Sequence, residues 1–369
     1  MTTPRRPKVF RVGGIRRDAT VEELIAALSA CFSDQEKDIK IEASIVPPCD
    51  STDDTNAGLV CFIPRAPEYL SLLNTTDGDT QLDTDVGELS FDNNFYGLTQ
   101  LYPTPRDQKI TADIIAVTGL DGHAYDSWRG KNESSKMWLR DFFSKDLPTC
   151  RTMIYGYNSK LCSSSIRDYN LGFLENIKRV RRTMEERERP LVFMGYSFGG
   201  IIVLQSLLAA AEAVPAGDLA AYSIFEATRT LMFFGTPHRG PLTEDILSMV
   251  DTKDHSERVK LVESIDKNNK DLEEQLQRFI NITPRFRIVS FYELKKTRKL
   301  VMQDANNTWS RSGDFIVPVG TDSALLNLPS SIETRIPVDK DHSTIVKFNS
   351  KQDGTYRTVV SHVWELTER

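Results

Sequence analysis

The feature that most constrains this chain is an apolar run that ends in a glycine-bracketed serine and continues at once as a second apolar run. The stretch reads LVFMGYSFGGIIVLQSLLAA and begins at residue 191. Its first four residues have the composition of a buried strand, and the run after the serine has the length and character of a helix. A strand that becomes a helix within one residue needs small neighbours, which Gly195 and Gly199 supply. The pattern therefore predicts a sharp turn that exposes the Ser197 hydroxyl at its apex.

From about residue 110 to the end of the chain, strand-like apolar runs alternate with helix-like runs. The predicted strands near this turn lie at residues 111–120, 149–157, 191–196, 228–237, 286–293 and 335–343. This alternation is typical of an α/β fold, in which helices cover both faces of a mostly parallel sheet. A polar stretch at about 241–283 has helical spacing and predicts a helical insertion over one end of the sheet.

Residues 1–102 follow a different pattern, in which the order β-α-β-β-α-β indicates a small ferredoxin-like α+β domain. Residues 103–109 contain two prolines and form the predicted linker to the domain at 110–369. The start resembles an RNA-recognition motif, but Leu59 and Cys61 stand where base-stacking aromatic residues are needed. Residues 1–105 also have a net charge of −8, which repels phosphate. No nucleic-acid partner is expected, and a protein-contact or packing role is favoured for this domain.

A nucleophilic serine needs a base, and the base needs an acid that orients it. His342 lies in a loop after the last predicted strand, where we expect the base. His238 comes too early in the chain, His255 lies in the polar insertion, and His362 lies in the final helix-like segment. Glu293 ends a predicted strand at the carboxyl edge of the sheet, where such folds build their sites. Three nearby aspartates remain alternatives for the acid: Asp322, Asp339 and Asp341.

Two backbone N–H groups are predicted to stabilise negative charge on the reacting oxygen. Phe198 follows the serine at the helix start, and Leu120 lies in the loop VTGLDGH after the first strand of the predicted sheet. Histidines and cysteines do not cluster at ligand spacings, and phosphate-loop and dinucleotide-binding patterns do not occur. We therefore expect neither a metal nor a cofactor.

The composition, 40% hydrophobic and 27% charged residues with a net charge of −6, is that of an ordinary soluble protein. Five cysteines at unrelated spacings indicate free thiols in a reducing compartment. The basic N-terminus precedes no apolar signal region, and no run of about 18 apolar residues exists. The expected location is cytoplasmic, with peripheral membrane association as a further option.

Several motifs together resemble the serine esterase/lipase-like α/β-hydrolases over roughly residues 110–360. These motifs are FMGYSFGG, FFGTPHRG, SFYE, VPVGTDSALL and DHSTIVKF. The sequence is most similar to the hydrolase domains at the N-termini of fungal NOD-like receptors and to the serine-active-site phospholipid-remodelling family. The resemblance implies an α/β-hydrolase fold, with Glu293 and His342 at the family's acid and base positions. Relatives usually carry histidine where this chain has Thr118 and Tyr196.

These observations predict a serine hydrolase that cleaves carboxylic esters through an acyl-enzyme, with a small-molecule or lipid ester as substrate and the lipid ester favoured. Ser197, His342 and Glu293 are the predicted nucleophile, base and acid. The alternative comes from another class of protein. It is a catalytically weak or inactive α/β-hydrolase module that acts in protein interaction or immune-type signalling.

Overall fold

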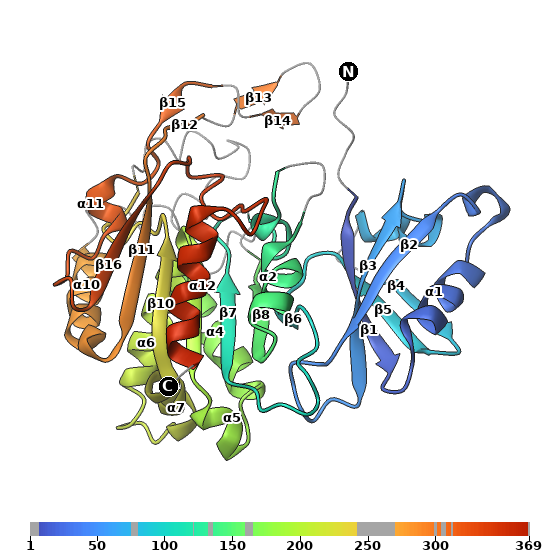
Figure 1. Ribbon diagram of the computed structural model, residues 1–369, viewed down its shortest axis with the longest axis horizontal. Coiled ribbons are helices and arrows are strands. Elements are labelled where there is room, and N and C mark those ends of the chain that lie inside the picture. Colours follow the sequence, from blue (N-terminus) through green and yellow to red (C-terminus); the bar gives the residue numbers. More distant parts are fainter. Residues whose placement is uncertain are drawn as a thin grey trace.

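The structure is a computed structural model in which two β-sheets lie side by side (Figure 1). The smaller sheet is built from the N-terminal residues, drawn in blue, and the larger sheet from most of the remaining chain. The structure describes residues 7–74, 80–120, 122–131, 136–158, 165–241, 270–298, 301–303, 308–310 and 313–367.

The smaller sheet has five antiparallel strands in the order β2-β3-β1-β5-β4. These strands are β1 (Val9–Arg16), β2 (Lys40–Val46), β3 (Thr55–Ile63), β4 (Thr80–Thr84) and β5 (Gly87–Asp92). Helix α1 (Val21–Ala30) begins with a capping box in which Thr20 and Glu23 satisfy each other's backbone N–H groups. The small α+β unit that the sequence predicts is therefore present.

One helix of this unit differs from the prediction. The sequence predicts an α-helix at residues 66–74, whereas the structure forms a 3₁₀ helix, η2 (Glu68–Asn74). The run is only seven residues long. At its start the Leu70 N–H donates to the Pro67 carbonyl oxygen at 3.1 Å, which is the i→i+3 bond of a 3₁₀ turn, and the Glu68 N–H donates to the Glu36 carboxylate at 2.6 Å.

The larger sheet has seven strands in the order β16-β11-β10-β9-β7-β8-β6. They are β6 (Gly97–Gln100), β7 (Ala112–Val117), β8 (Cys150–Gly156), β9 (Leu191–Tyr196), β10 (Thr228–Phe234), β11 (Arg287–Glu293) and β16 (Glu333–Val338). All neighbouring strands run parallel except β6, which is antiparallel to β8. Residues 97–100 fall within the predicted first domain, 1–102. In the structure they pair with the second sheet, because Leu98 packs into the core of that sheet.

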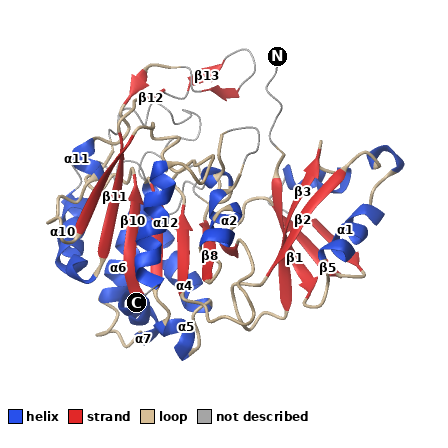
Figure 2. Ribbon diagram, in the orientation of Figure 1, coloured by secondary structure: helices blue, strands red, loops and turns tan. Residues whose placement is uncertain are grey.

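Helices cover both faces of the larger sheet (Figure 2). One core contains side chains of α4 (Ile166–Arg179), α6 (Phe198–Ala211), α7 (Leu219–Ala227) and α10 (Lys270–Ile282). The opposite core contains side chains of α2 (Trp138–Asp141), α3 (Phe143–Asp146) and α12 (Gly354–Thr367). Helix α10 is the described part of the predicted insertion, and residues 242–269 lie outside the described residues.

The remaining elements are short. They are η1 (Asp34–Glu36), η3 (Asp126–Trp128), α5 (Met184–Glu188), η5 (Thr283–Arg285), β12 (Thr297–Arg298), β13 (Val301–Gln303), β14 (Thr308–Ser310), β15 (Phe315–Ile316) and α11 (Thr321–Ala324). Among the described residues, no helix combines the length and the hydropathy that crossing a bilayer requires.

The two faces of the smaller sheet belong to different cores. Phe10 and Val60 pack in a core with side chains of α1. Their neighbours Val9 and Leu59 point the other way and join the core that lies between the two sheets, where Trp138 is also buried. The sheet face on which an RNA-recognition motif stacks bases thus faces the second domain, and its residue Leu59 belongs to the same core as Trp128 and Trp138.

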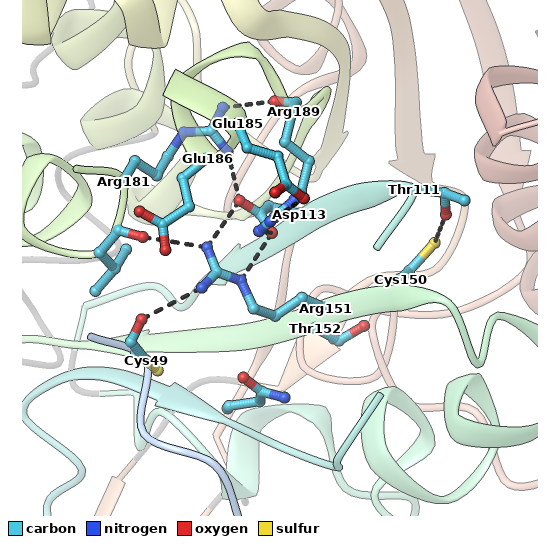
Figure 3. A network of polar contacts seen from close by, with 12 residues as sticks. Cys49, Thr111, Asp113, Cys150, Arg151, Thr152, Arg181, Glu185, Glu186 and Arg189 are labelled. Carbon is cyan, nitrogen blue, oxygen red and sulfur yellow. Dashed lines mark hydrogen bonds and ion pairs between the residues drawn. The ribbon is translucent and has the colours of Figure 1, made fainter. Parts of the chain in front are cut away.

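A buried ionic cluster lies at the amino edge of the larger sheet (Figure 3). Asp113 of β7 is fully buried and is contacted by the guanidinium groups of Arg151, Arg181 and Arg189. Arg151 makes two hydrogen bonds to it, at 2.8 and 2.9 Å. Arg151 also donates to the carbonyl oxygen of Cys49, at 3.3 Å. The cluster thereby ties the segment between β2 and β3 to the larger sheet.

Candidate active site

Ser197 lies at the turn between the central strand β9 and helix α6, as the sequence predicts. Its backbone has φ 53° and ψ −126°, a region that residues with a side chain rarely adopt. The Ser197 N–H donates to the carbonyl oxygen of Phe234 at 2.9 Å, which extends the pairing of β9 with β10 into the turn. A side chain at Gly199 would overlap the carbonyl oxygens of Val117 and Thr118. The strained serine is therefore held by its neighbours on both sides, a pattern that is concentrated at functional sites.

His342 and Glu293 lie within hydrogen-bond reach of this turn. Nε2 of His342 is 3.0 Å from Ser197 Oγ, and Nδ1 is 3.0 Å from Oε1 of Glu293. Glu293 is the last residue of β11 and pairs with Val338, the last residue of β16. Since both strands end at the same edge of the sheet, the loop after β16 can bring His342 back over the acid.

The structure also distinguishes the candidate acids. Glu293 is buried, and its side chain is only 2% exposed. Asp339 forms an ion pair with Lys295 at the surface, and Asp341 accepts hydrogen bonds from hydroxyl groups of its own loop. Asp322 is exposed. Among the described hydrogen bonds of the His342 ring, the carboxylate partner is Glu293.

The other histidines lie elsewhere. His238 is fully buried, with neither ring nitrogen hydrogen-bonded among the described residues. Burial, and then the charge of Arg239, lower the pKa of His238 to about 3, so this ring is neutral near pH 7. His362 is on α12, and burial is also the main cause that lowers its pKa. His255 lies outside the described residues.

The two predicted oxyanion donors border the serine. Phe198 is the first residue of α6, so its N–H belongs to the unpaired helix start and lies at the positive end of the helix dipole. Gly119, which precedes Leu120, packs directly on Ser197. A Cβ atom at Gly119 would lie 2.9 Å from Ser197 Cβ and 3.4 Å from Oγ. The loop that carries the Leu120 N–H is therefore next to the hydroxyl.

Thr118, in the loop after β7, and Tyr196, next to Ser197, are both held by hydrogen bonds. The Thr118 hydroxyl donates to Ser127 Oγ at 2.7 Å, and its carbonyl oxygen accepts from the Tyr157 hydroxyl at 2.9 Å. The Tyr196 hydroxyl donates to the carbonyl oxygen of His342 at 2.9 Å. Both residues therefore support segments of the site.

Three further residues shape the site and were missed by the sequence reasoning. Thr297 accepts the His342 N–H at 3.0 Å through its hydroxyl. His123 bridges two parts of the chain, because its Nε2 bonds the Asn93 carbonyl and its Nδ1 accepts the N–H groups of Tyr125 and Asp126. Gly235 has φ +52°, and a Cβ there would lie 2.9 Å from Glu293 Oε2 and 3.0 Å from His342 Nδ1. Gly235 lies in the motif FFGTPHRG and His123 in the loop VTGLDGH, so both stand in segments that the sequence singles out, whereas Thr297 has no such signal.

No group of three or more histidine, cysteine, aspartate or glutamate side chains in the described part of the chain is arranged to hold a metal ion. The four described cysteines are free thiols: Cys31, Cys49, Cys61 and Cys150. Burial is the main cause that raises the pKa of three of them, Cys49, Cys61 and Cys150, to about 11. These thiols are therefore poor nucleophiles near neutral pH.

The strand order, with one antiparallel edge strand and a serine turn directly after the central strand, makes this an α/β-hydrolase fold. No protein-family model matches the chain. Among curated proteins, Protein SERAC1 of Danio rerio is 24% identical over 328 residues, covering 81% of this chain and 45% of that protein. Protein SERAC1 of Homo sapiens is 25% identical over 178 residues, covering 43% and 26%. The chain thus spans less than half the length of the curated relatives it matches.

Solved structures with a similar fold include the mature form of lipase BlEst2 from Bacillus licheniformis. That lipase is 15% identical, with a TM-score of 0.48, and the match covers 73% of this chain and 99% of that chain. Phospholipase PlaB from Legionella pneumophila is 11% identical, with a TM-score of 0.37, covering 50% and 38%. None of the proteins named here is a fungal NOD-like receptor, so that part of the resemblance stays a prediction. The fold assignment rests on the strand order and the serine turn.

Proposed function

We propose that this chain is a serine hydrolase that cleaves carboxylic esters through an acyl-enzyme, with a lipid ester as the favoured substrate. The observation that carries the proposal is the continuous hydrogen-bonded chain from Ser197 Oγ through the His342 ring to Glu293, at 3.0 Å for each step. Nucleophile, base and orienting acid in this order are the arrangement that activates a serine hydroxyl.

In the first half-reaction, Ser197 Oγ attacks the ester carbonyl carbon while His342 Nε2 takes its proton. Glu293 accepts the Nδ1–H, which fixes the imidazole tautomer and stabilises the imidazolium that forms. The Phe198 and Leu120 N–H groups donate to the oxygen that becomes negative. The tetrahedral species collapses when the carbonyl carbon–alkoxy oxygen bond breaks, and the alcohol leaves with the proton from His342.

In the second half-reaction, water attacks the acyl-enzyme and gives its proton to His342. The Ser197 Oγ–acyl bond then breaks, Oγ takes the proton back, and the carboxylic acid leaves. Both half-reactions use the same base and the same two donors, so the chemistry needs no metal or cofactor.

Labelling with a fluorophosphonate probe tests the nucleophile directly, since such probes react covalently with activated serines. We expect the wild-type protein to label and the Ser197→Ala variant to remain unlabelled. Ser206→Ala is a matched control, because Ser206 is a buried serine further along the same helix, α6. Equal labelling of wild type and Ser197→Ala would show that Ser197 is not an activated nucleophile.

A panel of esters with acyl chains of increasing length, followed by phospholipid vesicles, tests the substrate class. The lipid-ester proposal predicts that kcat/KM increases with chain length. A wild-type protein that neither labels nor hydrolyses any ester on the panel would favour the alternative, an interaction module without catalysis.

A further inference from the structure

The His342 residue is held at its backbone as well as at its ring. Its N–H donates to the Thr297 hydroxyl at 3.0 Å, and its carbonyl oxygen accepts the Tyr196 hydroxyl at 2.9 Å. The ring bonds Glu293 on one side and Ser197 on the other. Four contacts from three separate segments therefore converge on one residue of a loop.

We propose that Tyr196 is a positioning residue for the base, which ties the loop of His342 to the same turn that carries the nucleophile. The inference rests on the proposed serine hydrolase function and deepens it. Tyr196 directly precedes Ser197 in the chain and is the last residue of β9. The hydrogen bond from its hydroxyl thus joins the turn to the His342 backbone, and the Ser197–His342 hydrogen bond joins the same two segments at the ring.

The second connection matters because one hydrogen bond leaves a loop free to rotate about it. With the backbone and the ring of His342 both bonded to the Tyr196-Ser197 turn, the separation of Ser197 Oγ and His342 Nε2 is restrained at two points. The aromatic rings support this arrangement. The Tyr196 ring lies 5.4 Å from the His342 ring and 6.5 Å from the buried Trp128, measured between ring centroids.

The length of the Tyr196 side chain contributes to this arrangement. The reach of the phenol places a donor at the backbone of His342, beyond the imidazole ring that it contacts. Tyr196 does not contact the reacting atoms through its hydroxyl, so its role is to position the base.

The main test is Tyr196→Phe, which removes one hydroxyl and keeps the ring. Misplacing a catalytic group by about 1 Å can cost about 100-fold in rate. We therefore expect kcat to fall about 10- to 100-fold, while KM changes less than about twofold because the hydroxyl that is removed binds the His342 backbone. The rate of fluorophosphonate labelling is expected to fall in parallel with kcat.

Tyr102→Phe is the matched control. The Tyr102 hydroxyl is buried and also donates to a backbone carbonyl, that of Leu147, but it lies away from Ser197. Both variants are expected to lower the melting temperature to a similar extent, and only Tyr196→Phe is expected to lower kcat. Equal losses of kcat in the two variants would reduce the effect of Tyr196 to general stability and overturn the proposal.

Thr297 provides an independent test of whether hydrogen bonds to the His342 backbone position the base. Thr297→Val removes the acceptor of the His342 N–H and is expected to lower kcat with little change in KM. Thr297→Ser keeps the hydroxyl and is expected to recover most of that loss. If serine rescues no better than valine, the hydrogen bond to His342 is not what matters at this position.

A measurement that needs no turnover separates this inference from the proposed function. In protein labelled with ¹⁵N-histidine, NMR reports the tautomer of His342 and the exchange of its Nδ1 proton with water. We expect a protected Nδ1–H in the wild type and faster exchange in Tyr196→Phe. If the fluorophosphonate probe does not react with the wild type but this NMR difference is observed, the hydrolase proposal is refuted and the positioning contact stands. An unchanged His342 signal with unchanged kcat would refute the positioning role.

Discussion

Two buried carboxylates of the larger sheet, Asp113 at the amino edge and Glu293 at the carboxyl edge, have opposite environments. At the amino edge, Asp113 is fully buried and receives hydrogen bonds from three arginines (Figure 3). At the carboxyl edge, Glu293 is also buried but bonds only the ring of His342. Its second oxygen, Oε2, has no hydrogen-bond partner among the described residues. In Asp113 both carboxylate oxygens are hydrogen-bonded, whereas in Glu293 one oxygen has no hydrogen-bond partner among the described residues.

A carboxylate with both oxygens hydrogen-bonded, such as Asp113, suits a structural role. Burial alone raises the pKa of Asp113, but the charges of Arg151, Arg181 and Arg189 outweigh it and hold the pKa below its usual range. Neighbouring carbonyl oxygens accept further donors of the cluster, from Arg151 and Arg181. Both carboxylate oxygens of Asp113 are hydrogen-bonded to arginines, so the cluster links the starts of β7, β8 and β9.

The free oxygen of the Glu293 carboxylate is consistent with its proposed role as the acid. Glu293 has one partner, and that partner is the histidine whose protonation changes during the proposed reaction. Its other oxygen faces Gly235, where any side chain would collide with it. A buried polar atom without a partner is costly. The carboxyl edge accepts that cost next to Ser197, whose backbone is itself strained.

The largest effect is expected from Glu293→Gln. The amide cannot take the Nδ1–H in the same way, which favours the imidazole tautomer that cannot accept the serine proton. We expect kcat to fall by about 10⁴-fold, as for an acid that fixes the tautomer of a catalytic histidine, with a small change in thermal stability. Kinetics and calorimetry on the same preparation check this. A large loss of stability with unchanged kcat would make Glu293 a second structural carboxylate.

The reverse pattern is expected for Asp113→Asn. Removing the charge that three buried arginines share is expected to cost about 3–5 kcal/mol of unfolding free energy at pH 7, with kcat per folded molecule unchanged. Because the folded pKa is depressed, the stabilisation is present above the usual carboxyl range and is lost as the pH falls through the folded pKa. Urea denaturation at several pH values is therefore expected to show the variant and wild type converging in acid. A constant difference down to the lowest pH would contradict the ionic origin.

His238 is also buried at the carboxyl edge, and neither of its ring nitrogens is hydrogen-bonded among the described residues. The His238→Phe variant sharpens the comparison through pH. The folded pKa is lowered to about 3, so the unfolded chain binds a proton below pH 6.5 that the folded protein does not. Wild-type stability is thus expected to fall with decreasing pH by up to about 1.4 kcal/mol per unit, or about 2 kcal/mol by pH 5. The variant is expected to lose this slope between pH 7.5 and 5. Parallel slopes would show that His238 has partners or solvent access.

The smallest effect is expected from Arg189→Lys at the amino edge. Arg189 makes the longest contact with Asp113, 3.2 Å. Because lysine retains the positive charge, we expect the unfolding free energy to fall by about 1 kcal/mol or less. Arg151→Lys is expected to cost more, because it gives up a paired contact with both carboxylate oxygens. Chemical denaturation of the two variants measures the difference, and an equal cost would argue against bidentate pairing as the main source of stability.

The serine turn could be predicted from the sequence because all of its requirements lie within five residues. Gly195 and Gly199 are needed by the close approach of strand and helix, and the order Ser197, Glu293, His342 follows the chain. The sequence favoured Glu293 over three aspartates because it ends a predicted strand, but it left those aspartates open, since the position of the acid under the His342 loop depends on the pairing of β11 with β16. It could not assign β6 to the second sheet either, since a four-residue strand carries too little pattern to show its neighbour.

By itself the sequence determined the alternation of strands and helices, the sharp turn at Ser197 and the type of residue available for each proposed role. Only the tertiary structure decided which segments meet. It placed Tyr196 and Thr297 on the backbone of His342, covered the open face of the smaller sheet, and gathered three arginines around Asp113. The physical reason is the sequence separation over which each kind of interaction acts. Turn geometry and hydrophobic period act between residues a few positions apart, whereas Tyr196 and His342, 146 positions apart, are brought to 2.9 Å only by the packing of the whole sheet.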